Sequence, residues 1–172
     1  MAAEPERADE SSRENEAYLA LSAKAEGTNI DPRTLLATDY LNHFNEIVMM
    51  LELIPDMPEC LEDAEAWEPK SYPQHFQDSQ FHDKALAIEA YDHVPDRYRQ
   101  PFDDVINNMN RMVPWGLQRI RDAMRAKDSP QVRLICTDVS RRLQKMIDIA
   151  SAIIHGSTRQ LDQAEIDGFF AA

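Results

Sequence analysis

The most regular apolar pattern in the chain lies between residues 130 and 155. Apolar side chains recur there in steps of four and three, which is the spacing of one face of an α-helix. Asp128-Ser129-Pro130 provides a helix start, with an acid at the cap and proline in the first turn. His155 and Gly156 provide an end. The positions of this stripe are Val132, Ile135, Val139, Leu143, Met146, Ala150 and Ile153.

Three further segments show helical periodicity, and they suggest partners for this helix. Asp31-Pro32 predicts the start of a helix over 31–54, and a less regular stripe predicts another over 73–91. A third is expected over 101–124, where Pro114 lies inside the run and predicts a kink.

With no strand signal, these segments predict an all-α fold, an antiparallel four-helix bundle over residues 31–156. One short extra helix is expected over 59–67. Residues 1–30 are rich in Glu, Asp, Ser and Ala and predict a mostly disordered acidic arm. Residues 157–172 form a separate tail, expected to be disordered until it docks. Valine and isoleucine in the last stripe would also suit pairing with a second copy in a homodimer.

Composition narrows the classes of partner. The 172-residue chain has 31 acidic and 18 basic residues and a formal net charge of -13, which disfavours nucleic acid and anionic membranes and favours a basic partner. Cys60 and Cys136 are isolated, so no zinc site is indicated. The first residues lack a secretory pattern and the longest apolar run is interrupted by Glu52. We therefore expect a cytoplasmic protein without membrane insertion.

The last dozen residues return to an amphipathic pattern. Asp162 can cap a short helix, with Glu165 at its third position. Ile166, Phe169 and Phe170 then fall at i, i+3 and i+4 on one face. Each phenylalanine gains about 1.5 to 3 kcal/mol on full burial, so either the protein's own body or a partner should cover this stripe.

This tail resembles the response-regulator-binding peptide of the flagellar motor switch proteins, Leu-Ser-Gln-any-Glu-Ile-Asp-any-Leu-Leu/Phe. Asp162 replaces the serine and keeps its capping role, and Gly168 lowers helix propensity by about 1 kcal/mol relative to alanine. The resemblance covers ten residues, which the switch proteins carry at their N-terminus. It implies docking of a CheY-type response regulator in chemotaxis or flagellar control, a form of two-component signalling. The implied partner-binding residues are Leu161, Gln163, Glu165, Ile166, Asp167, Phe169 and Phe170.

The overall layout also resembles, loosely, the CheZ-type chemotaxis phosphatase, a helical bundle that carries an Asp-any-any-any-Gln motif and ends in a regulator-binding peptide. That resemblance implies an alternative function, a phospho-aspartate phosphatase acting on a response regulator. An acid would engage a basic group while an amide one turn on orients the attacking water. In the last helix, however, Asp138 is followed at i+4 by Arg142, and Gln144 is at i+6.

Two other pairs are candidates for that catalytic role. Asp96 and Gln100 match the motif literally, but they lie between prolines at an expected turn, where the side chains need not share a face. Asp104 and Asn108 place an acid and an amide at the required spacing on a predicted helix.

A metal-binding helical bundle is a third alternative. The chain lacks the Glu-any-any-His order of di-metal carboxylate bundles, so ordinary interfacial or surface histidines are the simpler interpretation. We predict no metal site and no cofactor, since glycine-rich phosphate loops and nucleophile signatures are also absent from the sequence. The histidines with an acid at helical spacing are in the pairs His43 with Glu46, Asp78 with His82, and Glu89 with His93.

Overall fold

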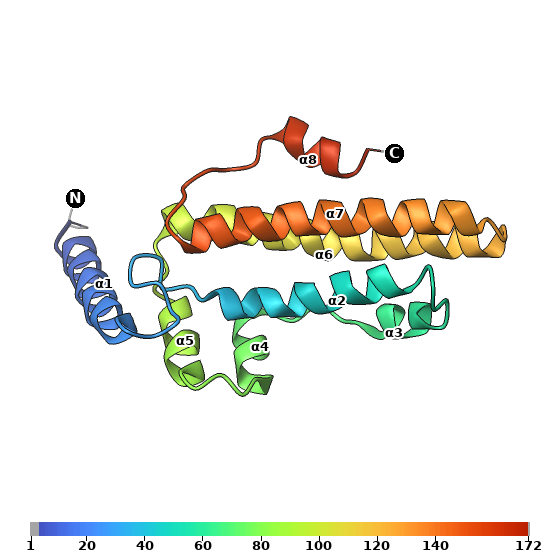
Figure 1. Ribbon diagram of the computed structural model, residues 1–172. Coiled ribbons are helices and arrows are strands. Elements are labelled where there is room, and N and C mark those ends of the chain that lie inside the picture. The colour runs from blue at the N-terminus through green and yellow to red at the C-terminus, as the bar shows by residue number, and fades with distance from the viewer. Residues whose placement is uncertain (1–3, 172) are drawn as a thin grey trace.

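The computed structural model describes residues 4–171, with side chains from residue 9 onward. The predicted all-α class is confirmed: the described residues form helices joined by turns (Figure 1), and their only β-type pairing is an isolated bridge between Ile30 and Ala37. None of the described helices is long and apolar enough to cross a bilayer. In chain order the elements are α1 (Glu4–Ala25), the 3-10 turn η1 (Thr38–Leu41), α2 (Asn42–Leu53), α3 (Cys60–Ala66), α4 (Tyr72–Asp78), α5 (Lys84–Tyr91), α6 (Asp96–Arg125), α7 (Ser129–Ile154) and α8 (Gln163–Phe169).

The two longest helices, α6 and α7, form an antiparallel hairpin, and α2 packs beside α7 (Figure 1). The turn between α6 and α7 contains Lys127, whose backbone is left-handed with φ 55°. Asp128 then accepts a hydrogen bond from the Gln131 amide at 3.0 Å. The hairpin is tight at Gly116, where an added β-carbon would lie 2.6 Å from Cγ1 of Val139. All seven apolar positions predicted for the last helix are buried in the common core.

The helix predicted from Asp31 is wrong over residues 31–37, and residues 38–41 form only the 3-10 turn η1. Asp31 uses its carboxylate to accept hydrogen bonds from the amides of Arg33 and Thr34, at 2.8 and 3.3 Å, which stabilises a turn in place of a helix. The turn also caps the C-terminal end of α7, because the Thr34 hydroxyl donates to the carbonyl of Ile154 at 2.6 Å. Such donors satisfy carbonyls that the end of a helix leaves free. Regular helix therefore begins only at Asn42.

The helix predicted over 73–91 is two helices. Ser71 caps α4 by accepting from the Gln74 amide at 3.2 Å, and α4 ends at Asp78. Ser79 adopts an extended backbone and donates its hydroxyl to the Phe76 carbonyl at 2.9 Å, which competes with continued helix. The chain restarts as α5 only at Lys84. The short acidic helix is confirmed as α3.

Helix α6 begins at Asp96, five residues earlier than predicted, and continues through Pro101 and Pro114 to Arg125. Pro95, with φ −57°, supplies the N-cap, and its carbonyl accepts from the amides of Tyr98 and Arg99 at 2.9 Å. A fixed backbone before the first turn favours a start there. The sequence prediction failed because it treated Pro101 as a start signal.

The N-terminal arm was predicted to be mostly disordered, and over Glu4–Ala25 that prediction is wrong, since these residues form α1. Leu21 and Ala25 are buried, and the Tyr18 hydroxyl donates to the Arg33 carbonyl at 2.8 Å. Helix α1 lies at one end of the molecule beside α5 (Figure 1). Its bulky apolar residues are concentrated in its last turns, where Leu21 reaches the core and Leu19 stays exposed. Residues 1–3 lie outside the described part of the chain.

Candidate functional site

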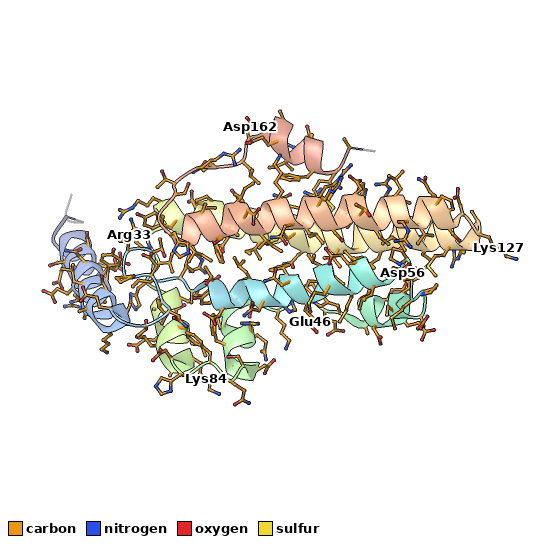
Figure 2. The ribbon with its side chains drawn as sticks, viewed as in Figure 1. Arg33, Glu46, Asp56, Lys84, Lys127 and Asp162 are labelled. Carbon is orange, nitrogen blue, oxygen red and sulfur yellow. The ribbon has the colours of Figure 1, made fainter. Side chains whose placement is uncertain are left out.

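The C-terminal segment contains the helix that the sequence predicts at Asp162. Asp162, labelled at the start of α8 in Figure 2, accepts from the Glu165 amide at 2.8 Å. The Glu165 carboxylate accepts from the Asp162 amide at 3.0 Å, which completes a capping box. Glu165 also pairs with Arg159, and Gln163 donates to Asp167 at 2.8 Å. Each of these contacts lies within residues 159–167, so the helix is stabilised from inside the tail.

Helix α8 lies along α7, on the side that faces away from α2 in Figure 1. Phe169 is 8% exposed, and the Phe170 ring meets Trp115 of α6 edge-on, with ring centroids 5.7 Å apart. The Arg142 guanidinium donates to the carbonyls of Phe169 and Ala171, each at 2.6 Å. The sequence left open whether the protein's own body or a partner covers the two phenylalanines, and in the structure the protein's own body covers them. The tail that we expected to be disordered is a docked helix.

We call the surface beneath α8 the tail-binding surface. It combines one aromatic ring with cationic and apolar side chains from both arms of the hairpin. The Arg111 guanidinium lies 4.7 Å from the Phe170 ring centroid, and the Lys145 ammonium lies 5.9 Å from that of Phe169. Cations over aromatic faces are favourable. The surface consists of Arg111, Trp115, Arg142, Lys145 and Ile149, where the last three also line a hollow of about 400 Å³ against the tail.

Charge on the two sides of this contact is complementary. The tail contributes the carboxylates of Asp162, Glu165 and Asp167, whereas the surface is cationic in a chain whose net charge is -13. Arg142 is anchored by Asp138 one turn away on α7, with a nitrogen-to-oxygen distance of 2.9 Å. Asp138 also faces Arg119 of α6 at 4.0 Å. The ion pair between Arg142 and Asp138 holds the Arg142 side chain in the position from which it reaches the tail carbonyls.

The seven predicted partner-binding residues are unequally exposed in this docked position. Gln163 and Asp167 are exposed to solvent, Phe169 is buried, and Leu161, Glu165, Ile166 and Phe170 are partly buried. The structure therefore places all seven on one short segment, but only the polar side of that segment is fully open. The two phenylalanines of the apolar stripe are turned towards the hairpin.

The Asp96 and Gln100 side chains are better placed than the sequence suggests. Both are exposed, and both lie in the first turns of α6, where a separation of four residues puts them on the same face of the helix. The expectation that this pair falls in a turn is wrong, because the helix starts directly after Pro95.

The second pair, Asp104 and Asn108, is differently arranged. Asn108 is 6% exposed, its amide nitrogen donates to the Asp104 carbonyl at 2.8 Å, and its amide oxygen accepts from Arg111 at 3.2 Å. An amide with both of its ends engaged in this way is not free to orient a water molecule. Its structural effect is to position Arg111 on the tail-binding surface.

Sequence reasoning missed Trp115, Arg111 and Arg142 as functional residues. A weak signal exists, since Arg111 and Arg119 flank Trp115 at four residues on either side, an unusual concentration of cations around an aromatic residue in an acidic chain. Nothing in the sequence shows that Arg142 faces the same ring, although its guanidinium lies 5.5 Å from the Trp115 centroid.

The histidines do not form a metal centre in the part of the chain that is described, where no three metal-ligating side chains gather. His43 is buried, its ring stacks on Trp67 with centroids 4.5 Å apart, and its Nε2 accepts from the Lys70 amide at 3.1 Å. Burial is the main cause that lowers the pKa of His43 to about 4. The acceptor role requires a neutral ring, so His43 serves to hold the segment after α3.

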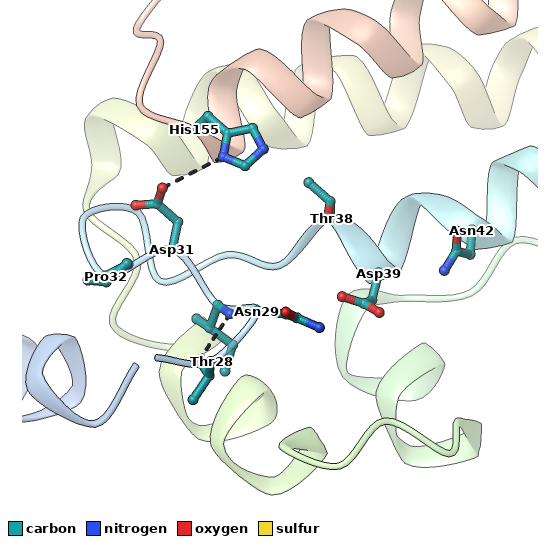
Figure 3. Close-up of a pocket in the computed structure, with 9 residues that line it drawn as sticks. Thr28, Asn29, Asp31, Pro32, Thr38, Asp39, Asn42 and His155 are labelled. Carbon is teal, nitrogen blue, oxygen red and sulfur yellow. Dashed lines mark hydrogen bonds and ion pairs between the residues drawn. The ribbon is translucent and has the colours of Figure 1, made fainter. Parts of the chain in front are cut away.

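An open polar hollow of about 560 Å³ lies between the loop over residues 28–32, the start of α2 and the end of α7 (Figure 3). Asp31 and His155 lie on its wall, with a nitrogen-to-oxygen distance of 3.8 Å between them. Asp31 is already engaged by the amides of its own turn. The hollow therefore follows from the loop that packs against the end of α7, and its lining is mainly polar, whereas ligand sites are lined mainly by apolar side chains.

Comparisons of the chain with protein-family models, with curated proteins and with solved structures gave no match. Its function is therefore inferred from its own residues.

Proposed function

We propose that this protein docks a CheY-type response regulator through α8, in chemotaxis or flagellar control. The observation that carries the proposal is the capping box of Asp162 and Glu165, which holds the motif-bearing segment as a helix by contacts made within the tail itself. A recognition helix that is already formed loses less conformational entropy on binding than a disordered peptide.

Part of the motif is accessible to a partner while α8 lies against the hairpin. Gln163 and Asp167 are open to a partner in the present position, and Ile166 is only partly covered. The carboxylates of the tail favour a basic patch on the partner, which agrees with the acidic balance of the whole chain. Full engagement of the stripe requires α8 to leave the hairpin, because Phe169 is buried there.

The test is a titration of the full chain with the receiver domains of the same cell, with and without phosphorylation. Ile166→Ala removes apolar contact area, and we expect it to weaken binding about tenfold or more, equivalent to about 1.4 kcal/mol. Gln160→Ala, an exposed position just before the motif, is the matched control and should leave the affinity unchanged. Failure of every receiver domain to bind the full chain would refute the proposal.

A second candidate function, a CheZ-like phosphatase, is favoured by one observation. Asp96 and Gln100 are exposed on one face of a regular helix, as an acid and a water-orienting amide need to be. The test follows phosphate release from a phosphorylated regulator with catalytic amounts of the protein. Release should slow to the regulator's own rate in Gln100→Ala and not in Gln144→Ala, an exposed amide on α7. If the unaltered protein does not accelerate release, this candidate is excluded.

A cytoplasmic location and pairing with a second copy belong to the same proposal. Large apolar side chains exposed on and after α2, namely Met49 at 60%, Leu53 at 49% and Met57 at 45%, support pairing. Sedimentation of the purified chain over a range of concentrations tests it, and a constant monomer mass would contradict it.

A further inference from the structure

We propose that the tail-binding surface is an intramolecular competitor of the regulator, which holds α8 back until a partner displaces it. The inference rests on the proposed docking function and adds a regulatory step to it. The occupant of the surface is this chain's own C-terminal segment, as the structure shows it.

The first reason is that the two positions of α8 exclude each other. Phe169 is buried against the hairpin and Phe170 is in contact with Trp115 and Arg111. These phenylalanines belong to the apolar stripe that a partner would have to cover. Because one side chain cannot fill both places, every partner that uses the stripe must first remove α8 from the hairpin.

The second reason is that the holding contact is limited in extent. Helix α8 has seven residues, and Phe169 is its one buried side chain in the described structure. The polar part of the contact depends largely on Arg142, whose two hydrogen bonds reach the last turn and Ala171. A contact of this size suits an equilibrium between held and released states, as a competitive switch requires.

The third reason is that release does not require α8 to unfold. The capping box, the Arg159 to Glu165 pair and the Gln163 to Asp167 bond all travel with the tail. Residues 157–162 have no regular secondary structure and connect α8 to the end of α7. The helix can therefore move as a unit.

This arrangement has a consequence that simple docking lacks. When only a fraction of the molecules has a free tail, the apparent dissociation constant is the intrinsic one divided by that fraction. Weakening the tail-binding surface should therefore strengthen the binding of the regulator, even though the altered residue lies outside the docking motif. With about one molecule in ten released, complete loss of holding would tighten binding about tenfold.

The experiment compares Arg142→Ala with Arg141→Ala in the full chain. Arg141 is the adjacent exposed cation, lines the same hollow, and has no hydrogen bond or ion pair with the tail among the described residues. The two changes alter net charge equally. Arg111→Ala, at an exposed position over Phe170, is a second, independent variant. Thermal unfolding of each variant establishes that the bundle is intact.

Two readouts separate this inference from the proposed function. Without any regulator, amide hydrogen exchange over residues 163–171 should be several-fold faster in Arg142→Ala than in Arg141→Ala, because a seven-residue helix frays more often once it is free of the hairpin. With the regulator, the affinity should increase several-fold in Arg142→Ala and Arg111→Ala and stay constant in Arg141→Ala.

Equal exchange in the arginine-142 and arginine-141 variants would overturn the holding contact whatever the regulator does. Faster exchange accompanied by weaker regulator binding would overturn the competition. Faster exchange in Arg142→Ala, with no regulator binding to any variant, would refute the proposed function and with it the competition. The contact that holds α8 against the hairpin would still be supported. Protection that increases with protein concentration would show a second copy as the occupant, contrary to the inference.

Discussion

Gly116 in the middle of α6 gives the sharpest test of the packing described above. A β-carbon added there would lie 2.6 Å from Cγ1, 3.0 Å from Cγ2 and 3.4 Å from Cβ of Val139. The contact with Cγ1 is shorter than a packed interior tolerates, the contact with Cγ2 is tight, and the contact with Cβ is ordinary van der Waals contact, so Val139 or its helix must shift. Gly116→Ala should therefore force the two arms of the hairpin apart.

Two opposing terms decide the sign of the change in stability. Alanine in place of glycine inside a helix stabilises by about 1 kcal/mol through helix propensity alone. Overpacking of a close-packed interior destabilises by about 1 to 3 kcal/mol. Because Val139 is fully buried and on a helix that packs on both sides, we expect the upper half of that range and a net loss of about 1 to 2 kcal/mol.

The assay is chemical denaturation followed by circular dichroism, which gives the free energy of unfolding from the midpoint and slope. Gly168→Ala is the control, since a β-carbon there would meet nothing within 4 Å. That change should leave the bundle's stability unaltered or slightly higher. A gain in stability for Gly116→Ala, as an isolated helix would show, would refute the close approach of α6 and α7.

Three further outcomes are expected. The pKa of His43 is lowered to about 4 in the folded protein against about 6.5 unfolded, so its contribution is complete above pH 6.5 and is lost as pH falls towards 4. A pH series of unfolding midpoints should show a loss of about 1 to 3 kcal/mol, which His43→Gln should reduce but not abolish, because burial also lowers the pKa of the neighbouring His75; an unchanged slope in that variant would contradict the role given to His43. Raising salt from 0.05 to about 0.5 M should accelerate hydrogen exchange over residues 163–171, because screening weakens attraction between the acidic tail and its cationic surface; exchange indifferent to salt would show that apolar contact alone holds α8. Burial raises the pKa of Cys136 to about 11, so a thiol reagent at neutral pH should modify it only on unfolding, and rapid labelling of the native protein would contradict its burial.

The parts of the fold that depend on local pattern were predictable. The stripe of α7 is regular over its whole length, and its cap at Asp128 and its end near His155 lie where those residue types predict them. The capping box at Asp162 is equally local, because its two partners are three residues apart. In both segments, the residues that form the sequence pattern also make the contacts, and they lie only a few positions apart in the chain.

The failures arise where distant residues compete with local preference. The turn at Asp31 is favoured because Thr34 reaches the carbonyl of Ile154, which is 120 residues away in the sequence. The docking of α8 depends on Phe170 meeting Trp115 and on Arg142 reaching backbone carbonyls, none of which leaves a pattern in the sequence. Half of the candidate site, the motif itself, was therefore visible from the sequence, and the surface that holds it was not.

The short connection over residues 157–162 makes the encounter between α8 and the hairpin unimolecular. Six residues span at most about 20 Å, so a released helix explores a small volume around its own binding surface, equivalent to a local concentration in the millimolar range. Dilution of the protein leaves the ratio of closed to open molecules untouched. The open fraction of the uncaptured molecules would then be the same whatever amount of this protein is made, and capture would depend on the abundance and the affinity of the partner that takes the helix.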